Sequence, residues 1–297
     1  MKLKDVRSHY SLMAQDYIDQ YDKKLKLSRF EYPANYNRLE LILNLCKGLK
    51  VNNVLDAGVG AGVPLLKVAK KTKAKNIHAF DYTQEMVDFC KDYLKNKNFK
   101  NTNIYKGSVE KRSSFKKALI NGKIDIALML GVMPHVKNDL IVLKNLRSVM
   151  SKNSRAFVSF RNKLFNIFTL NRYSYDFFIN DLLSITDNKS LNISKKNLKN
   201  FFNMNQPTVR KVNIKGGTGY DLILSKMHNP LEIEKLFKKA GFSKIKIHWY
   251  HLHSTIPQLQ NKFKSKKEFY ISSLKLEHKD NWRGMFLASA FLVEAIN

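Results

Sequence analysis

Hydrophobic residues follow two alternating patterns between positions 50 and 160 of this 297-residue chain. Short apolar runs predict strands at residues 53–56, 76–81, 103–106, 124–130 and 156–160. Between these runs, apolar side chains recur every three or four positions, which predicts amphipathic helices such as those over residues 84–94 and 140–150. Strands that alternate with helices form a parallel sheet with helices on both faces, so we predict an α/β fold.

The pattern breaks between residues 161 and 228, where Asn, Lys and aromatic residues are frequent and no clear strand alternation is present. We interpret this segment as a mainly helical insertion that caps the carboxyl edge of the sheet. Asn229-Pro230 is typical of a helix start and Gly241 of a helix end. Strands at 244–253 and 285–293 then flank a Lys-rich helix near 258–276. These two strands bring the predicted, mostly parallel sheet to seven strands, and we expect its last strand to be antiparallel.

Composition agrees with a folded globular chain, because 44% of the residues are hydrophobic and 11% are aromatic. The N-terminal stretch lacks the apolar core of a secretion signal, and no window approaches about eighteen uninterrupted apolar residues. We therefore expect a cytoplasmic protein without a membrane span, as a monomer or a homodimer. Cys46 and Cys90 are the only cysteines and lie far apart, which favours neither a disulfide framework nor a zinc site.

The net charge of +29, from 53 basic and 24 acidic residues, introduces a polyanion as a candidate partner. Such a charge attracts nucleic acid, an acidic membrane or a phosphorylated substrate. Here the basic residues are mostly lysines spread along the chain, whereas recognition of phosphates and bases recruits arginine forks. A bias in composition is therefore the favoured interpretation, and specific nucleic-acid binding is the alternative.

Residues 54–66, VLDAGVGAGVPLL, contain an apolar run, an acid and three alternate glycines before a helical pattern. Each glycine omits a β-carbon that would keep a ligand away from the backbone N–H groups. A phosphate loop is excluded, because Gly62 is followed by Val63-Pro64 rather than by Lys and Ser or Thr. The GxGxxG dinucleotide fingerprint would place its third glycine at position 63, so a different ligand fits better.

This turn resembles the first motif of the class I S-adenosylmethionine (SAM)-dependent methyltransferases, an acid followed by three alternate glycines, here Asp56, Gly58, Gly60 and Gly62. SAM carries no phosphate, which agrees with the absence of lysine after the turn. In this family an acid at the end of the second strand holds both ribose hydroxyls, and Asp81, next to Tyr82, stands at that place. A carboxylate can accept two hydrogen bonds from a diol. The resemblance implies a Rossmann-like fold with SAM as cofactor.

Two further segments resemble the same family. The loop Gly107-Ser108-Val109-Glu110 is similar to the family's adenine-bracketing loop, but Ser108 stands where Asp is common. Either Ser108 or Glu110 is therefore the candidate adenine contact. Residues 130–136, LGVMPHV, are similar to the end of the fourth strand in small-molecule methyltransferases, and Leu130 is an expected cofactor contact.

The resemblance divides the chain into four regions. We expect N-terminal lid helices over residues 1–48 and the SAM-binding Rossmann-like core over residues 49–160. Residues 161–228 form the mainly helical substrate cap insertion in this division. Residues 229–297 supply a helix and strands that complete the core sheet.

Three histidines are candidate catalytic residues. His135 follows the fourth strand and is the candidate base, since the ordinary pKa of histidine suits proton removal near neutrality; a structural role in the turn is an equal alternative. His251 and His253 share one face of a strand through their period-two spacing, which favours a substrate contact or a base. No third ligand accompanies them, so we predict no metal site.

The candidate substrate-binding residues are polar or aromatic. Arg161 and Asn162 follow the fifth strand and Arg172 lies in an aromatic-rich segment, where arginine suits a phosphate or carboxylate of the acceptor. Tyr17 and Tyr21 resemble tyrosines that similar enzymes place on a lid helix over SAM. The alternatives are solvated arginines and aromatic rings that only pack.

These features predict a SAM-dependent methyltransferase that methylates a hydroxyl or an amine of a small metabolite. Anionic compounds, such as a nucleotide-linked sugar or a phosphorylated compound, are the candidate acceptors. An RNA or other nucleic-acid methyltransferase, recruited by the basic charge, is the alternative, although the Asn/Asp-Pro-Pro-aromatic signature of base-flipping enzymes is absent after the fourth strand. A SAM-binding protein without catalysis is a third hypothesis, motivated by Ser108.

Overall fold

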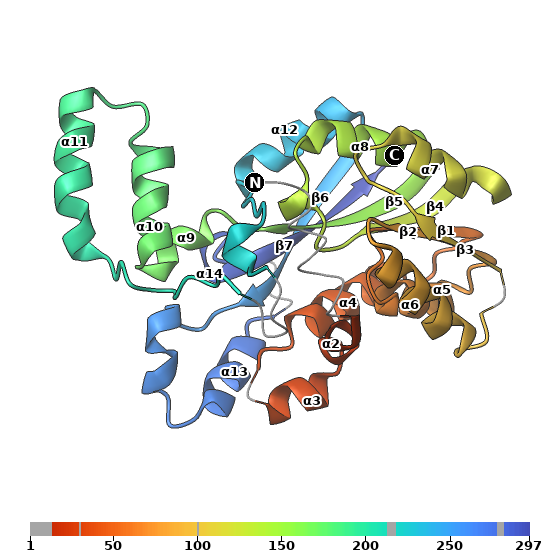
Figure 1. The fold of residues 1–297 in the computed structure, drawn as a ribbon, viewed down its shortest axis with the longest axis horizontal. Helices are drawn as coiled ribbons and strands as arrows, with labels where there is room; N and C mark the ends of the chain where they lie inside the picture. The colour runs from red at the N-terminus through yellow and green to blue at the C-terminus, as the bar shows by residue number, and fades with distance from the viewer. Residues whose placement is uncertain (1–13, 30, 100, 213–217, 278–281) are drawn as a thin grey trace.

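The computed structural model describes residues 14–297 except 30, 100, 213–217 and 278–281, so the first thirteen residues of the expected lid region lie outside the described part. A seven-stranded sheet in the order β3-β2-β1-β4-β5-β7-β6 runs through the centre of the molecule (Figure 1). Its strands are β1 (Asn53–Ala57), β2 (Asn76–Asp81), β3 (Thr102–Lys106), β4 (Ile124–Met129), β5 (Met150–Arg161), β6 (Lys244–Leu252) and β7 (Ala288–Ile296). Neighbouring strands from β3 to β5 are parallel, whereas β7 is antiparallel to both β5 and β6. The predicted sheet, with its antiparallel last strand, is confirmed.

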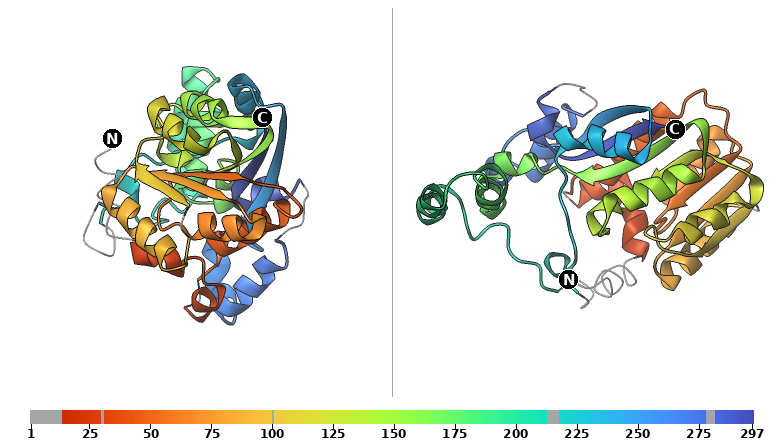
Figure 2. Two further views of the ribbon diagram at one scale, coloured as in Figure 1. Left: turned by 90° about the vertical axis from the view of Figure 1, so that its right-hand side faces the viewer. Right: turned by 90° about the horizontal axis from the view of Figure 1, so that it is seen from above.

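Each face of the sheet packs against its own set of helices (Figure 2). One face is covered by α7 (Arg112–Lys116), α8 (Asp139–Ser148) and α12 (Pro230–Ala240), and the other by α4 (Ala34–Leu45), α5 (Val63–Thr72) and α6 (Gln84–Lys95). Alternate residues of one strand serve the two cores, since Val54 packs in one core and Leu55 in the other. Burying a side chain of this size stabilises the fold by about 1.5–3 kcal/mol, so both faces hold the sheet.

Side-chain caps define where the core helices begin. Thr83 accepts a hydrogen bond from the Met86 N–H at the start of α6, and Asn138 accepts one from the Ile141 N–H at the start of α8. The predicted helix after Asn229 is confirmed as α12, which ends at Gly241 in a left-handed conformation. These caps fix the helices that follow β2 and β4, next to the carboxyl edge of the sheet.

Three element boundaries differ most from the sequence prediction, and the others agree within about two residues. β5 begins at Met150, six residues early, because its first polar residues belong to the same strand. The helix predicted near 258–276 is instead a 3-10 turn, η6 (Pro257–Lys262), followed by α13 (Lys266–Leu274), because Ser265 caps a new helix through the Glu268 N–H. The last strand begins three residues late, because α14 (Gly284–Leu287) precedes it.

The helices before β1 and the helices after β5 pack in different ways. At the N-terminal end, α2 (Ala14–Asp19) and α3 (Lys23–Ser28) lie beside α4 (Figure 1). After β5, α9 (Phe165–Thr169), α10 (Arg172–Phe177) and α11 (Asn188–Asn197) leave the sheet. In Figure 1 and in the right-hand view of Figure 2, α10 and α11 project side by side away from the body. No helix among the described residues is long and apolar enough to cross a membrane.

The insertion returns to the sheet as an extended segment that crosses the turn after β4. The Lys226 N–H donates to the Pro134 carbonyl at 2.8 Å, and the His228 N–H donates to the Arg161 carbonyl at 2.9 Å. Asp139 accepts hydrogen bonds from Lys226 Nζ at 2.7 Å and from His228 Nε2 at 3.3 Å. This returning segment is therefore fastened to the carboxyl edge, although the helices before it project outward.

Candidate active site

A cavity of about 430 Å³ lies at the carboxyl edge of the sheet. Its wall is built by the turns after β1 to β4, the end of β5 and side chains from the N-terminal helices. A volume of this size is within the range of small-molecule sites. The predicted site residues on the wall are Tyr17, Tyr21, Gly58, Gly60, Gly62, Asp81, Tyr82, Ser108, Val109, Glu110, Leu130, His135 and Arg161.

The three glycines of the turn after β1 have different structural reasons. All three have positive φ, at +88° for Gly58, +52° for Gly60 and +82° for Gly62. A β-carbon at Gly58 would lie 2.4 Å from Val132 Cγ2, and one at Gly62 would lie 2.7 Å from Cys90 Sγ. A β-carbon at Gly60 would meet no atom within 4 Å. Gly58 and Gly62 are thus required by packing, whereas Gly60 leaves open space on the cavity wall.

Asp81 anchors this turn from the end of β2. Its Oδ2 accepts from the Gly60 N–H at 3.0 Å, and its Oδ1 accepts from the Thr83 N–H at 3.1 Å. Burial raises the pKa of Asp81, while the hydrogen bonds from Gly60 and Thr83 act to lower it. Oδ2 keeps a second lone pair, and the second position on Oδ1 takes a long hydrogen bond from the Thr83 hydroxyl at 3.3 Å. If a ligand hydroxyl replaces this long bond, Asp81 can accept two hydrogen bonds from a diol.

Asp56 lies beneath the turn rather than on the cavity wall. Only 2% of its surface is exposed, and its Oδ1 has no hydrogen-bond partner. Burial and the neighbouring charge of Asp81 raise the pKa of Asp56 well above its usual value, and Arg38 acts in the opposite direction. Asp56 can therefore affect a ligand in the cavity only indirectly, through its electrostatic interactions with Asp81 and Arg38.

Arg38, from α4, is a buried cation on the cavity wall that the sequence analysis missed. Its guanidinium donates to the Tyr21 hydroxyl at 2.9 Å and to Ser159 Oγ at 3.4 Å, and it lies 5.9 Å from the Tyr250 ring centre. Only 6% of Arg38 is exposed, and its Nε has no partner. Because a buried guanidinium needs an acceptor, Arg38 is suited to hold a ligand carboxylate.

The ring of His135 is held in one orientation by the returning segment. Its Nδ1 lies 2.6 Å from the Leu224 carbonyl oxygen. A carbonyl can only accept, so Nδ1 carries the proton and Nε2 is the accepting nitrogen of the neutral ring. His135 is 9% exposed and meets the Tyr220 ring edge-on at 5.9 Å. This arrangement suits a general base on the cavity wall.

The loop after β3 joins the cavity wall to the turn that carries His135. Ser108 Oγ accepts from the Glu110 N–H at 3.3 Å, and Glu110 Oε1 accepts from the Lys137 N–H at 2.6 Å. Both side chains keep a further acceptor position, so both stay candidates for contact with a base amino group.

Several predicted residues do not lie on the cavity wall. Asn162 is buried, and its Nδ2 donates to the carbonyls of Met285 and Ala288 at 2.7 Å each, which ties α14 to β5. Arg172 lies in an adjoining cluster of arginines. His251 and His253 belong to a separate aromatic cluster.

The His251 and His253 rings lie 4.9 Å apart, and His251 stacks on Tyr32 at 4.7 Å. His253 also lies 4.7 Å from the Phe165 ring. Burial lowers the pKa of His251 to about 4 and that of His253 well below its usual value. The geometry therefore joins these histidines to Tyr32 and Phe165 rather than to the cavity.

Other wall residues also went unnoticed in the sequence. Ser159 on β5 and Tyr250 on β6 lie shortly before the predicted site residues Arg161 and His251. This closeness in sequence is the one signal that could have indicated them. Tyr220 lies in the returning segment, where no periodic pattern distinguishes it from its neighbours.

A family model described as a methyltransferase domain matches residues 50–206. A probable cobalt-precorrin-6B C(15)-methyltransferase (decarboxylating) from Methanocaldococcus jannaschii is 29% identical over 107 residues. That match covers 33% of this chain and 57% of the relative, so the chain spans little more than half the length of this curated protein.

Two solved structures share the fold over nearly the whole chain. A chain of the complex between the Haloferax volcanii Trm112 methyltransferase activator and a methyltransferase has a TM-score of 0.56 and 10% identity, with 98% of both chains covered. Magnesium protoporphyrin IX methyltransferase from Synechocystis PCC 6803, solved with bound SAH, has a TM-score of 0.52 and 13% identity, with both chains covered completely. At these identities the likeness is one of fold.

Proposed function

The chain belongs to the methyltransferase domain family, and from this premise we propose that it methylates a hydroxyl or an amine of a small molecule, with His135 as the base. SAM is the cofactor of this class I enzyme. When bound, SAM supplies an electrophilic methyl group on a sulfonium sulfur. The remaining tasks belong to the protein, which has to orient the acceptor and remove its proton.

The cavity residues fit SAM. Asp81 has acceptor capacity for the ribose hydroxyls, and the open space at Gly60 allows a ligand to approach the backbone closely. Arg38, with its unpartnered buried Nε, is the candidate partner of the SAM carboxylate. Ser108 and Glu110 are the candidate adenine contacts.

The observation that carries the proposal is the fixed tautomer of His135. Because Nδ1 donates to the Leu224 carbonyl at 2.6 Å, Nε2 is the nitrogen that can accept a proton from the acceptor hydroxyl or ammonium group. The protonated ring keeps its bond to Leu224, so proton transfer requires no reorientation. His251 and His253 lie off the cavity wall and have no part in this step.

A small acceptor is favoured over RNA by the way the cavity is covered. Tyr17 and Tyr21 from the N-terminal region, Tyr220 from the returning segment and Tyr250 from β6 all line it, so its aromatic cover comes from three segments. Nucleic-acid sites combine aromatic platforms with an open basic groove that follows the backbone. The RNA methyltransferase hypothesis keeps the support of the +29 charge and is tested in the same experiment.

The experiment incubates the protein with methyl-labelled SAM and separate pools of nucleotide sugars, phosphorylated metabolites, small amines and total RNA. We expect label in a small-molecule pool. The variant His135→Asn keeps an amide donor for the Leu224 carbonyl and removes Nε2, so turnover should fall about 10²- to 10⁴-fold. The affinity for S-adenosylhomocysteine, measured by calorimetry, should stay unchanged.

Label found only in RNA would overturn the small-molecule proposal. Unchanged turnover in His135→Asn would remove the assignment of the base but not the reaction. The pool that becomes labelled, and the position of the methyl group in the product, would decide between oxygen and nitrogen as the acceptor atom.

A further inference from the structure

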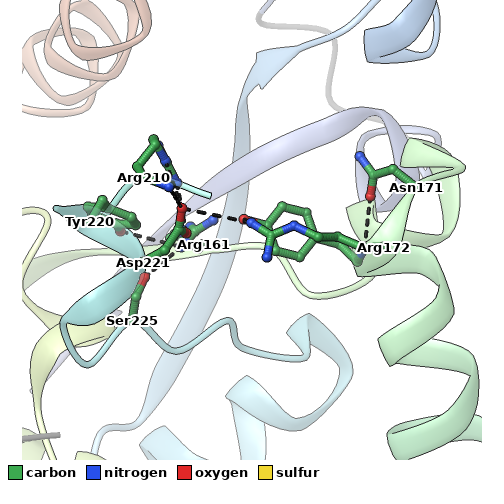
Figure 3. A network of polar contacts seen from close by, with 8 residues as sticks. Arg161, Asn171, Arg172, Arg210, Tyr220, Asp221 and Ser225 are labelled. Atoms are coloured by element: carbon green, nitrogen blue, oxygen red, sulfur yellow. Dashed lines mark hydrogen bonds and ion pairs between the residues drawn. The ribbon is translucent and has the colours of Figure 1, made fainter. Parts of the chain in front are cut away.

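Three arginines from three separate segments converge beside the cavity (Figure 3). Arg161 ends β5, Arg172 begins α10 and Arg210 lies in the segment that returns from the insertion. Arg210 pairs with Asp221 at 3.2 Å, and Arg172 Nη2 lies 3.8 Å from the same carboxylate. Guanidinium carbons of Arg161 and Arg210 lie 5.4 and 4.8 Å from the centre of the Tyr220 ring. We call these residues, with Ser225, the arginine cluster.

The arginine cluster carries an excess of positive charge. Burial acts to raise the pKa of Asp221, but hydrogen bonds from Arg210 and the nearby charge of Arg172 lower it below the usual value, so Asp221 is ionised. Among the described residues, Asp221 is the one carboxylate within ion-pair distance of the cluster, where it pairs with Arg172 and Arg210. With three arginines and one carboxylate, the net charge of the cluster is 3 − 1 = +2. Asp176 acts on Arg172 only from beyond that distance. Partly buried charge of one sign is costly without a counterion.

Donors in the cluster are also left unused. Arg161 Nη1 donates to Ser225 Oγ at 2.6 Å and to the Tyr220 hydroxyl at 3.4 Å, both neutral acceptors. Within the described residues, Arg161 Nε and Nη2 have no acceptor, and neither does the buried Nε of Arg172. A guanidinium with two free donors matches the paired oxygens of a phosphate or a carboxylate.

The cluster opens onto the same wall as the candidate base. Arg161 and Tyr220 both line the cavity, and Tyr220 meets the His135 ring edge-on at 5.9 Å. We propose that the arginine cluster binds an oxyanion group of the acceptor, a phosphate or a carboxylate, through Arg161 with support from Arg172 and Arg210. This deepens the proposed function, on which it rests, by naming the acceptor as an anionic small molecule.

Binding of the oxyanion is tested first without a methyl acceptor. The whole 297-residue chain, saturated with S-adenosylhomocysteine, is titrated by calorimetry with inorganic phosphate and with acetate at constant ionic strength. We expect binding of at least one anion, weakened about 10- to 100-fold in Arg161→Gln because a charge-assisted bidentate contact is lost. The control Arg283→Gln removes an exposed arginine at the N-cap of α14, outside the cluster, and should bind as the unaltered protein does.

A second variant keeps the test decisive if the first one does not fold. If Arg161→Gln unfolds, Arg210→Gln gives the same reading, since the Arg210 side chain is 53% exposed and its loss leaves the sheet intact. Anion binding that is equal in the unaltered protein and both variants, or no binding of either anion, overturns the proposal. The anion that binds more tightly identifies phosphate or carboxylate as the recognised group.

Methyl transfer separates this inference from the proposed function. Acceptor pairs that differ only in a phosphate or carboxylate are compared, and the charged member should be methylated at least about tenfold faster. Equal rates would overturn the inference while the proposed function stands. If S-adenosylhomocysteine does not bind and no acceptor is labelled, the proposed function fails, and the same calorimetric titration of the protein without S-adenosylhomocysteine still tests the anion site.

Discussion

The glycine region, formed by residues 58–62, Asp81 and residues 107–110, is built from three turns that follow β1, β2 and β3, whereas the arginine cluster is assembled from β5, α10 and a returning segment. In the glycine region, parallel strands bring short turns together at one edge, so position follows from the sheet. In the arginine cluster, side chains meet through ion pairs and ring contacts across about sixty residues of chain (221 − 161 = 60). The first region depends on backbone geometry and the second on charge.

The largest expected effect concerns the carboxylate that defines the glycine region. Asp81→Ala removes the acceptor of two charge-assisted hydrogen bonds from the ribose, each worth about 1.5–3 kcal/mol. The affinity for S-adenosylhomocysteine should therefore fall at least about 100-fold in calorimetry. The control Asp88→Ala removes an exposed carboxylate of α6 and should bind normally. An Asp81→Ala affinity within threefold of the control would show that the glycine region does not depend on this acid.

The next effect concerns the histidine pair, which belongs to neither region. His251 has a pKa of about 4 when folded, against about 6.5 when unfolded, because burial disfavours its charged form. The unfolded state thus binds more protons, so this contribution to stability is complete above pH 6.5 and is lost as the pH falls toward 4. The loss amounts to about 3 kcal/mol. Denaturant unfolding at several pH values measures it.

The matched variant for this test is His251→Asn, because Asn tolerates the left-handed backbone at φ +59°. The free energy of unfolding should depend less on pH between 6.5 and 4 in the variant than in the unaltered protein. Methyl transfer at neutral pH should be retained. Loss of turnover with intact cofactor affinity would instead support a catalytic role for the histidine pair.

The smallest expected effect is a difference in stability between two glycine variants. It distinguishes a glycine required by packing, Gly58, from a glycine that leaves space for a ligand, Gly60. Gly58→Ala places a β-carbon 2.4 Å from Val132, whereas Gly60→Ala places one in open space. Both variants carry the strain of a positive φ, so Gly58→Ala should lower the unfolding free energy by about 2 kcal/mol more, from overpacking alone. Gly60→Ala should chiefly weaken the binding of S-adenosylhomocysteine. Equal stability of the two variants would contradict the packing role of Gly58.

The sequence was informative where local pattern and site coincide. Strand ends mark the glycine turn, Asp81 and His135, because a parallel sheet places every strand's carboxyl end at one edge. The last strand is antiparallel because the chain returns at the edge where β6 ends, so that Leu252 pairs with Ala288. Arg161 was found for the same reason, since it ends β5.

The remaining wall residues had no such signal. Arg38 lies among the buried residues of α4, so its periodicity is that of a core helix and its charge is the only indication of a site. Arg210 contacts the Tyr220 ring while it is hydrogen-bonded to Asp221, and Tyr220 accepts a hydrogen bond from Arg161. Such contacts depend on tertiary structure rather than on sequence spacing. The same holds for Asn162, whose polar side chain at a strand end proved to hold α14 and β7 in place.

The place of β7 between β5 and β6 has a consequence during synthesis on the ribosome. β6 joins the sheet only through β7, and β7 begins 127 residues after β5 ends (288 − 161). At about 5–20 residues per second, the apolar edge of β5 stays unpaired for roughly 6 to 25 seconds while the insertion, α12 and β6 emerge. An unpaired strand edge is a template for association with other chains. A nascent chain of this topology therefore has a defined interval in which chaperone cover would protect it.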